Sequence, residues 1–191
     1  MNGLEIPIRR ATADDQDHLI PLINAAFKIA EPFMTGPRTD PERLAAVMAK
    51  GEILLAQDAA GQLAASVYAE VRGERGYIGM LAVDPARQRS GLGRFMMHSA
   101  EQHLLNQGCV AVDITVLSLR PELPRFYRKL GYTETGTEEF HYPHPIQGGL
   151  ECHCIVMSKP LRDKALILSP NGDKIGAGEP PCEPPLPLKT N

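Results

Sequence analysis

The turn between Val83 and Arg94 concentrates the residues of this chain best suited to hold an anionic group. It reads Val-Asp-Pro-Ala-Arg-Gln-Arg-Ser-Gly-Leu-Gly-Arg, so that arginines bracket a pair of glycines. An apolar strand is predicted before the turn and a helix after it. Backbone N–H groups and the positive end of the helix dipole would then point at one spot. Glycine at 91 and 93 lets the main chain approach a ligand where a Cβ would collide. The segment predicts a phosphate-binding loop.

Two common phosphate-binding motifs do not fit this segment. A Walker loop ends in Gly-Lys-Ser/Thr, and Arg94-Phe95 stands there instead. A dinucleotide fingerprint needs a third glycine where this chain has Met96. What remains is Gln88-x-x-Gly91-x-Gly93 after a predicted strand that ends near Val83. On this segment alone, an ordinary surface turn before a helix stays open as the alternative.

A second segment, farther along the chain, helps to decide between a phosphate-binding loop and an ordinary surface turn. Residues 126 to 132 read Phe-Tyr-Arg-Lys-Leu-Gly-Tyr, and they follow the strand predicted after the glycine-turn helix. Together the two segments resemble the GNAT superfamily of N-acetyltransferases, in which a pyrophosphate loop is followed by a Phe/Leu-Tyr-x-Lys-x-Gly-Phe/Tyr segment. The resemblance covers residues 6 to 160 in element order, and the motif matches lie within 81 to 132. Two segments at the right separation are more specific than either alone.

The resemblance implies a coenzyme A thioester, acetyl-CoA, as cosubstrate and direct transfer of its acetyl group to a primary amine. The amine of a small molecule is the favoured acceptor. The strand end would pair with the pantetheine arm, the turn would hold the pyrophosphate, and Gln88 would orient the loop. The residues implied in cofactor binding are Leu81, Ala82, Val83, Gln88, Arg89, Ser90, Gly91, Leu92, Gly93 and Arg94.

Tyr127 matches the family's general acid, which protonates the departing sulfur. A phenol with a pKa near 10 is protonated at neutral pH and able to donate. The alternative is a packing aromatic beside Phe126. The backbone N–H of Met80 or Leu81 is the expected donor to the developing oxyanion.

A general base is harder to place. Many relatives carry a carboxylate on the fourth strand, where this chain reads Tyr77-Ile78-Gly79-Met80. Glu70 and Glu122 are substitutes by location, although each alone is typical of a solvated or ion-paired surface charge. A chain of waters that carries the proton to solvent is the third option.

The acceptor contacts are expected from Arg120, Phe33 and Met34. Arg120 stands where many relatives have Asn, and it either binds a substrate carboxylate or pairs with Glu122. Phe33 and Met34 lie in a loop that flanks the acceptor site in relatives. The alternative functions are a protein acetyltransferase that acts on an N-terminus or a lysine, and a non-catalytic acetyl-CoA-binding module.

Composition bounds the partners. A net charge of −3 gives no reason to expect nucleic acid or an anionic membrane surface, and no apolar run is long enough to span a bilayer. The four cysteines show neither a disulfide framework nor zinc spacing, so we expect reduced thiols, no metal and a cytoplasmic location. A homodimer is an open alternative for the assembly.

Apolar periodicity predicts an α/β (α+β) domain with the GNAT fold, in which helices flank a mixed, mostly antiparallel sheet of about seven strands. We assign residues 1–162 to this domain and residues 163–191, rich in Pro and Gly, to a flexible or loosely docked tail. Strands are expected at Ile6 to Ala11, Glu52 to Gln57, Gln62 to Val71, Tyr77 to Val83, Val110 to Leu117, Tyr132 to Phe140 and Cys152 to Ser158. Helices are expected over 13 to 29, from Pro41 to before Gly51, from Gly91 to about Gln107, and around Leu123 to Leu130.

Overall fold

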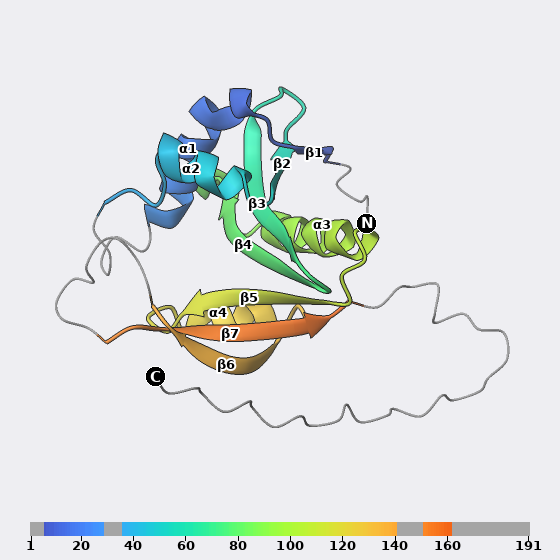
Figure 1. Ribbon diagram of the computed structural model, residues 1–191. Helices are drawn as coiled ribbons and strands as arrows, with labels where there is room; N and C mark the ends of the chain where they lie inside the picture. Colours follow the sequence, from blue (N-terminus) through green and yellow to red (C-terminus); the bar gives the residue numbers. More distant parts are fainter. Residues whose placement is uncertain (1–5, 29–35, 141–150, 162–191) are drawn as a thin grey trace, which may run out of the picture.

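A seven-stranded sheet forms the centre of the protein in the computed structural model, which describes residues 6–28, 36–140 and 151–161 (Figure 1). The strand order is β1-β2-β3-β4-β5-β7-β6, and only β4 and β5 pair in parallel. The expected mixed, mostly antiparallel sheet is therefore confirmed. Its strands are β1 (Ile8–Arg10), β2 (Glu52–Gln57), β3 (Leu63–Arg72), β4 (Arg75–Val83), β5 (Ala111–Leu117), β6 (Thr133–Glu139) and β7 (His153–Pro160).

Helices cover both faces of the sheet and divide the core into two clusters. The alternation of side chains along β2 shows the division, because Ile53 and Leu55 pack in one cluster and Leu54 and Ala56 in the other. The first cluster is closed by α1 (Gln16–Phe27) and α2 (Pro41–Met48), and the second by α3 (Leu92–Asn106) and α4 (Glu122–Arg128). Two short 3-10 turns, η1 (Ala13–Asp15) and η3 (Pro85–Arg87), precede α1 and α3. No helix in the described ranges is long and apolar enough to cross a membrane.

β4 and β5 diverge half-way along their length, and this divergence creates the space for a ligand. Their parallel pairs run from Arg75 with Ala111 to Ile78 with Ile114 and then stop (Figure 1). β4 also carries a bulge against β3, at which Met80 adopts a positive φ of 47°. From Gly79 onward, the edge of β4 that faces β5 has no partner strand among the described residues.

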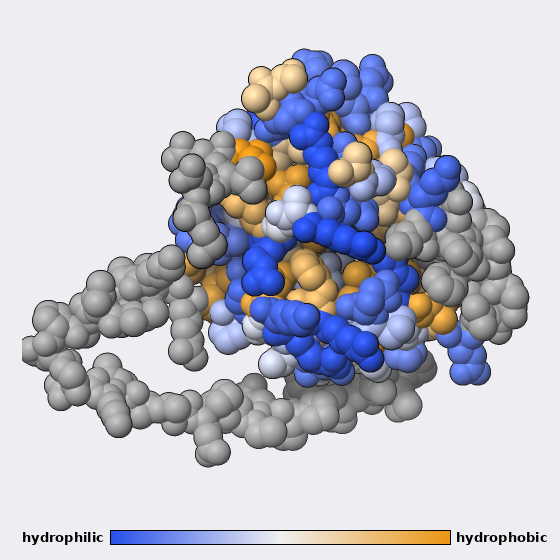
Figure 2. Space-filling view, turned by 180° about the vertical axis from the view of Figure 1, so that it is seen from behind, coloured by the Kyte–Doolittle hydropathy of each residue, from blue (hydrophilic) through white to orange (hydrophobic). Residues whose placement is uncertain are grey.

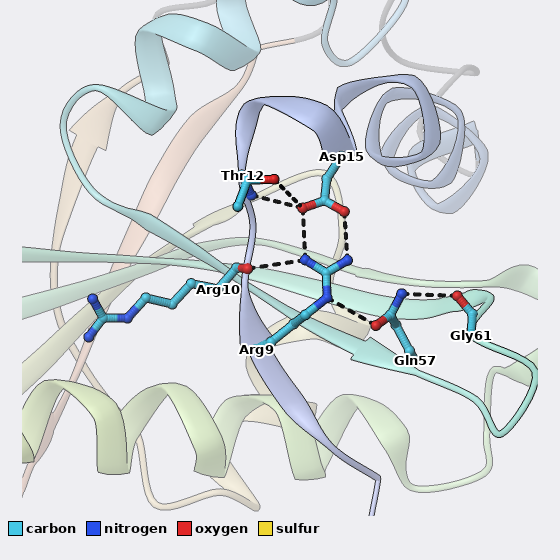
Figure 3. Close-up of polar contacts among 6 residues, drawn as sticks. All are labelled: Arg9, Arg10, Thr12, Asp15, Gln57 and Gly61. Atoms are coloured by element: carbon cyan, nitrogen blue, oxygen red, sulfur yellow. Dashed lines mark hydrogen bonds and ion pairs between the residues drawn. The ribbon is translucent and has the colours of Figure 1, made fainter.

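An ion pair fastens the first strand to the turn that leads into α1 (Figure 3). Arg9 donates from Nη1 and Nη2 to the two oxygens of Asp15, at 2.8 and 2.6 Å, and from Nε to Gln57 of β2 at 3.0 Å. The backbone N–H of Thr12 also donates to Asp15, at 2.8 Å. The bond from Arg9 holds the pKa of Asp15 well below its usual range, although partial burial opposes this.

Asp15→Asn is expected to lower the free energy of unfolding at pH 7 by about 1 kcal/mol, because Arg9 is 41% exposed and its ion pair is screened. A folded-state pKa below the unfolded one gives stability that is present above pH ~4 and lost as the pH falls further. Denaturant unfolding at pH 7 and pH 3 should therefore show the difference shrinking at pH 3. Asp14→Asn, on the exposed side of the same turn, is the matched control. An equal difference at both pH values would contradict an ionic origin.

Candidate active site

A cavity of about 1180 Å³ opens where β4 and β5 part. It is lined by β4 from Tyr77 to Leu81, by β5 from Ile114 to Leu117, and by residues of α1, α4 and the glycine turn. Figure 2 views the protein from behind and shows a hollow near the middle of this face, with apolar surface inside it and hydrophilic side chains around it. The cavity thus combines an apolar interior with a polar rim.

The glycine turn brings several unpaired backbone N–H groups to one end of this cavity. Gly91 caps α3 with a φ of 91°, in the left-handed region that favours glycine. Within the described residues, the N–H groups of Arg89, Ser90, Gly91, Gly93 and Arg94 have no acceptor. The first N–H groups of a helix have no partner inside the helix, so they are available to an anion.

The arginines of the turn divide into two kinds. Arg89 and Arg94 are exposed, line the cavity and have no ion-pair partner among the described residues. Arg87 instead binds Asp58, on the loop between β2 and β3, and lies 3.5 Å from Asp84. Arg87 therefore holds the turn in place and does not line the cavity.

Seven of the ten residues expected in cofactor binding line the cavity: Leu81, Val83, Gln88, Arg89, Gly91, Gly93 and Arg94. Ala82 and Leu92 are instead buried in the two core clusters, and Ser90 bonds the Arg87 carbonyl at 2.7 Å. Gln88 reaches the Val83 carbonyl at 3.4 Å, which ties the turn to the end of β4.

Tyr127 enters the same cavity from α4. Its ring is half-buried, and packs edge-on against Phe126 at 5.0 Å and Tyr132 at 5.9 Å between centroids. Its hydroxyl has no hydrogen-bond partner within the described residues. Burial, and to a lesser degree the nearby Tyr77, raise the pKa of Tyr127 to about 12, so the hydroxyl keeps its proton at neutral pH. Tyr127 can therefore donate a proton to a ligand atom.

A buried ion pair holds the surroundings of Tyr127 in place. Glu101 of α3 is 5% exposed and accepts bonds from Lys159 of β7 at 2.7 Å and from the Tyr132 hydroxyl at 3.0 Å. The N–H of Tyr132 in turn donates to the Tyr127 carbonyl at 3.1 Å. The network joins the helix that begins at the glycine turn to the segment that carries Tyr127.

The two carboxylates expected as bases lie in different surroundings. Glu122 lines the cavity at the start of α4 and is bound by Arg120, whose side chain is 15% exposed and also lines the cavity. That ion pair lowers the pKa of Glu122 against the opposing effect of its burial. Glu70 does not line the cavity. It binds Arg72 at 2.6 Å, which lowers the pKa of Glu70, and of these two residues only Arg72 lines the cavity. Phe33 and Met34 lie outside the described residues.

Several lining residues were not anticipated from the sequence. They include Arg72 and Tyr77 on β3 and β4, and Thr115 and Leu117 on β5. The alternation along β5 contained a signal for two of them, because Thr115 and Leu117 fall on the face opposite the buried Val112, Ile114 and Val116. The place of Arg72 and Tyr77 beside the cavity depends instead on the pairing of β3 with β4.

A family profile described as the acetyltransferase (GNAT) domain matches residues 29–142, which is more than half of the chain. The chain belongs to the GNAT acetyltransferase family. The matched region includes the glycine turn and Tyr127, so the family assignment and the cavity involve the same residues.

Several acetyltransferases resemble the chain in sequence or in fold. A mycothiol acetyltransferase of Propionibacterium freudenreichii is 26% identical over 137 residues, which are 68% of this chain and 44% of that protein. The chain thus spans less than half the length of this curated relative. A ribosomal-protein-alanine N-acetyltransferase from Brucella melitensis superposes with a TM-score of 0.65 at 17% identity, covering 82% of this chain and 100% of the other. A phosphinothricin acetyltransferase from Sinorhizobium meliloti, solved in complex with AcCoA, gives 0.65 at 14% identity, covering 83% and 89%. These two structures support the GNAT fold.

Proposed function

We propose that this GNAT protein is an N-acetyltransferase that uses acetyl-CoA to acetylate a primary amine, with a small molecule as the preferred acceptor. One observation carries the proposal. The β4 edge, the glycine-turn N–H groups named above and the Tyr127 hydroxyl all border one cavity, and none of them has a partner among the described residues.

The described residues fit a coenzyme A thioester. The unpaired edge from Gly79 to Val83 would take the amide-bearing pantetheine arm as though it were an added strand. The N–H groups between Arg89 and Arg94 would bind the diphosphate, and the two exposed arginines would add salt-sensitive attraction. Gln88 would keep the turn against β4.

Acetyl-CoA, when bound, supplies an acetyl group joined to sulfur as a thioester. Tyr127 would donate its proton to that sulfur as the carbon–sulfur bond breaks. The N–H groups at Met80 or Leu81, beside the bulge, would stabilise the carbonyl oxygen. Glu122 would accept the amine proton directly or through water, since it is the sequence-predicted base that lines the cavity. Glu70, which does not line the cavity, would not contact the amine.

The surroundings of the cavity favour a small acceptor over a protein segment. Phe27 of α1 and Glu138 of β6 both line the cavity, and Arg38 lies 5.0 Å over the Phe27 ring. Side chains from two distant elements would therefore close around an acceptor, as expected for a pocket that encloses most of a small ligand.

Two measurements test the proposal. Calorimetric titration with acetyl-CoA is expected to show saturable binding to one site that weakens as salt is raised. Release of the free thiol is then expected in the presence of amines, measured across small amines, amino acids and peptides. Absence of acetyl-CoA binding would refute the proposal. Binding without thiol release from any acceptor would instead favour a non-catalytic binding module, and release only with peptides would favour a protein acetyltransferase.

A further inference from the structure

We infer that the acceptor amine carries a carboxylate, and that Arg72 binds this group. The inference rests on the proposed function and narrows its substrate class. It begins with Arg72, which the sequence did not single out and which borders the cavity from the end of β3, away from the glycine turn.

Arg72 is held in a fixed place by two contacts. Its guanidinium lies 4.0 Å from the centroid of the Tyr77 ring, and its Nη2 donates to Glu70 at 2.6 Å. A guanidinium that is stacked and ion-paired loses little further freedom when it binds a ligand.

The remaining donors of Arg72 are available to a ligand. Within the part of the chain that the structure describes, its Nε and Nη1 have no acceptor, and its side chain is 53% exposed. The neighbouring Asp113 is already occupied, because Arg75 and Ser158 bind its two oxygens. Each of these N–H groups can donate a charge-assisted hydrogen bond to a carboxylate oxygen.

The Tyr77 ring, on which the Arg72 guanidinium stacks, lies at the point where β4 diverges from β5. A Cβ on Gly79 would stand 2.9 Å from Cε1 of Tyr77, so the ring covers this glycine closely. Gly79 is the first residue of β4 after its last pair with β5. Arg72 is thereby placed beside the strand edge proposed to hold the thioester arm.

The carboxylates that line the cavity lie toward its other end. Glu138 of β6 pairs with Cys154 of β7, which pairs in turn with Leu117 of β5. Tyr77 of β4 pairs with Asp113, at a different position on β5. Asp113 and Leu117 are four residues apart on β5, or roughly 13 Å along the strand. Glu138 has no ion-pair partner among the described residues. An acceptor whose carboxylate binds Arg72 and whose ammonium lies toward Glu138 would meet an opposite charge at each end of the cavity.

Matched acceptors test this inference. A series of ω-amino carboxylates of increasing length is compared with the carboxamides of the same length, by thiol release. The wild-type protein is expected to favour the carboxylate in kcat/KM by about tenfold or more at one length, as for a charge-assisted hydrogen bond. Arg72→Gln should remove the preference by raising KM for the carboxylate while kcat for the carboxamide is kept, and Arg72→Lys should retain part of it. Arg10→Gln, which breaks an exposed ion pair with Glu52 outside the cavity, is the matched control.

A second measurement covers the case in which no tested acceptor reacts. The thermal shift that each carboxylate gives to the protein saturated with coenzyme A should exceed that of its carboxamide, and Arg72→Gln should abolish the excess. The inference would be overturned if the wild-type protein used and bound the carboxylates and the carboxamides equally. It would also be overturned if Arg72→Gln lost activity with both series. Calorimetric binding of acetyl-CoA is scored separately, so failure of the proposed function is recognised by itself.

Discussion

Tyr127→Phe is expected to lower kcat by about a hundredfold or more while the affinity for acetyl-CoA is largely kept. General acids contribute roughly 10² to 10⁴ to a rate, and the substitution removes only the hydroxyl that supplies the proton. Because this hydroxyl has no partner in the described part of the protein, its removal leaves no buried donor or acceptor unpaired. Assays of thiol release give kcat, and calorimetric titration gives the affinity for acetyl-CoA.

Tyr132→Phe separates the chemical effect from a structural one. The Tyr132 hydroxyl is bound to the buried Glu101, so its loss should lower the free energy of unfolding by about 1 to 3 kcal/mol. Tyr127→Phe should change that free energy far less and kcat far more. Unchanged turnover in Tyr127→Phe would remove this residue from its role as the acid.

The architecture could be predicted from the sequence because each element has a regular apolar pattern. Val112, Ile114 and Val116 alternate along β5 and are all buried, and the helix predicted from Gly91 to about Gln107 is α3 (Leu92–Asn106). Glycines marked the ends of elements, as at Gly108 and Gly131, both of which have positive φ. Element ends differ by one to two residues in most cases because helix and strand ends depend on local hydrogen bonds.

Contacts between distant segments could not be predicted from these patterns. Arg87 stands in the same turn as Arg89 and Arg94, yet its partner Asp58 is 29 residues away in sequence. Glu70 was expected to act as a base, and its pairing with Arg72 beside Tyr77 depends on where β3 and β4 place their side chains. The divergence of β4 from β5 likewise has no signature in either strand alone. Local motifs located the proposed donor-binding end of the cavity, whereas the acceptor end required the three-dimensional arrangement.

Gly91→Asp is expected to abolish the binding of acetyl-CoA. Gly91 has a φ of 91°, a conformation that side chains rarely adopt, although no atom lies within 4 Å of the position that a Cβ would occupy. The variant would therefore meet strain but no steric clash in the free protein. Its carboxylate would stand among the N–H groups proposed to hold the diphosphate. Two like charges about 4 Å apart near a protein surface repel by ~4 kcal/mol, which is about a thousandfold in affinity.

Gly91→Asn isolates the contribution of charge. Asn has the same shape as Asp and tolerates the left-handed conformation at least as well, so both variants meet the same backbone strain. Calorimetry with acetyl-CoA should show modest weakening for Gly91→Asn and no measurable binding for Gly91→Asp, with both proteins unfolding at similar denaturant concentrations. Raising the salt concentration should narrow the gap, because the repulsion is screened. Equal affinities for the two variants would show that no anionic group of the ligand lies at the start of α3.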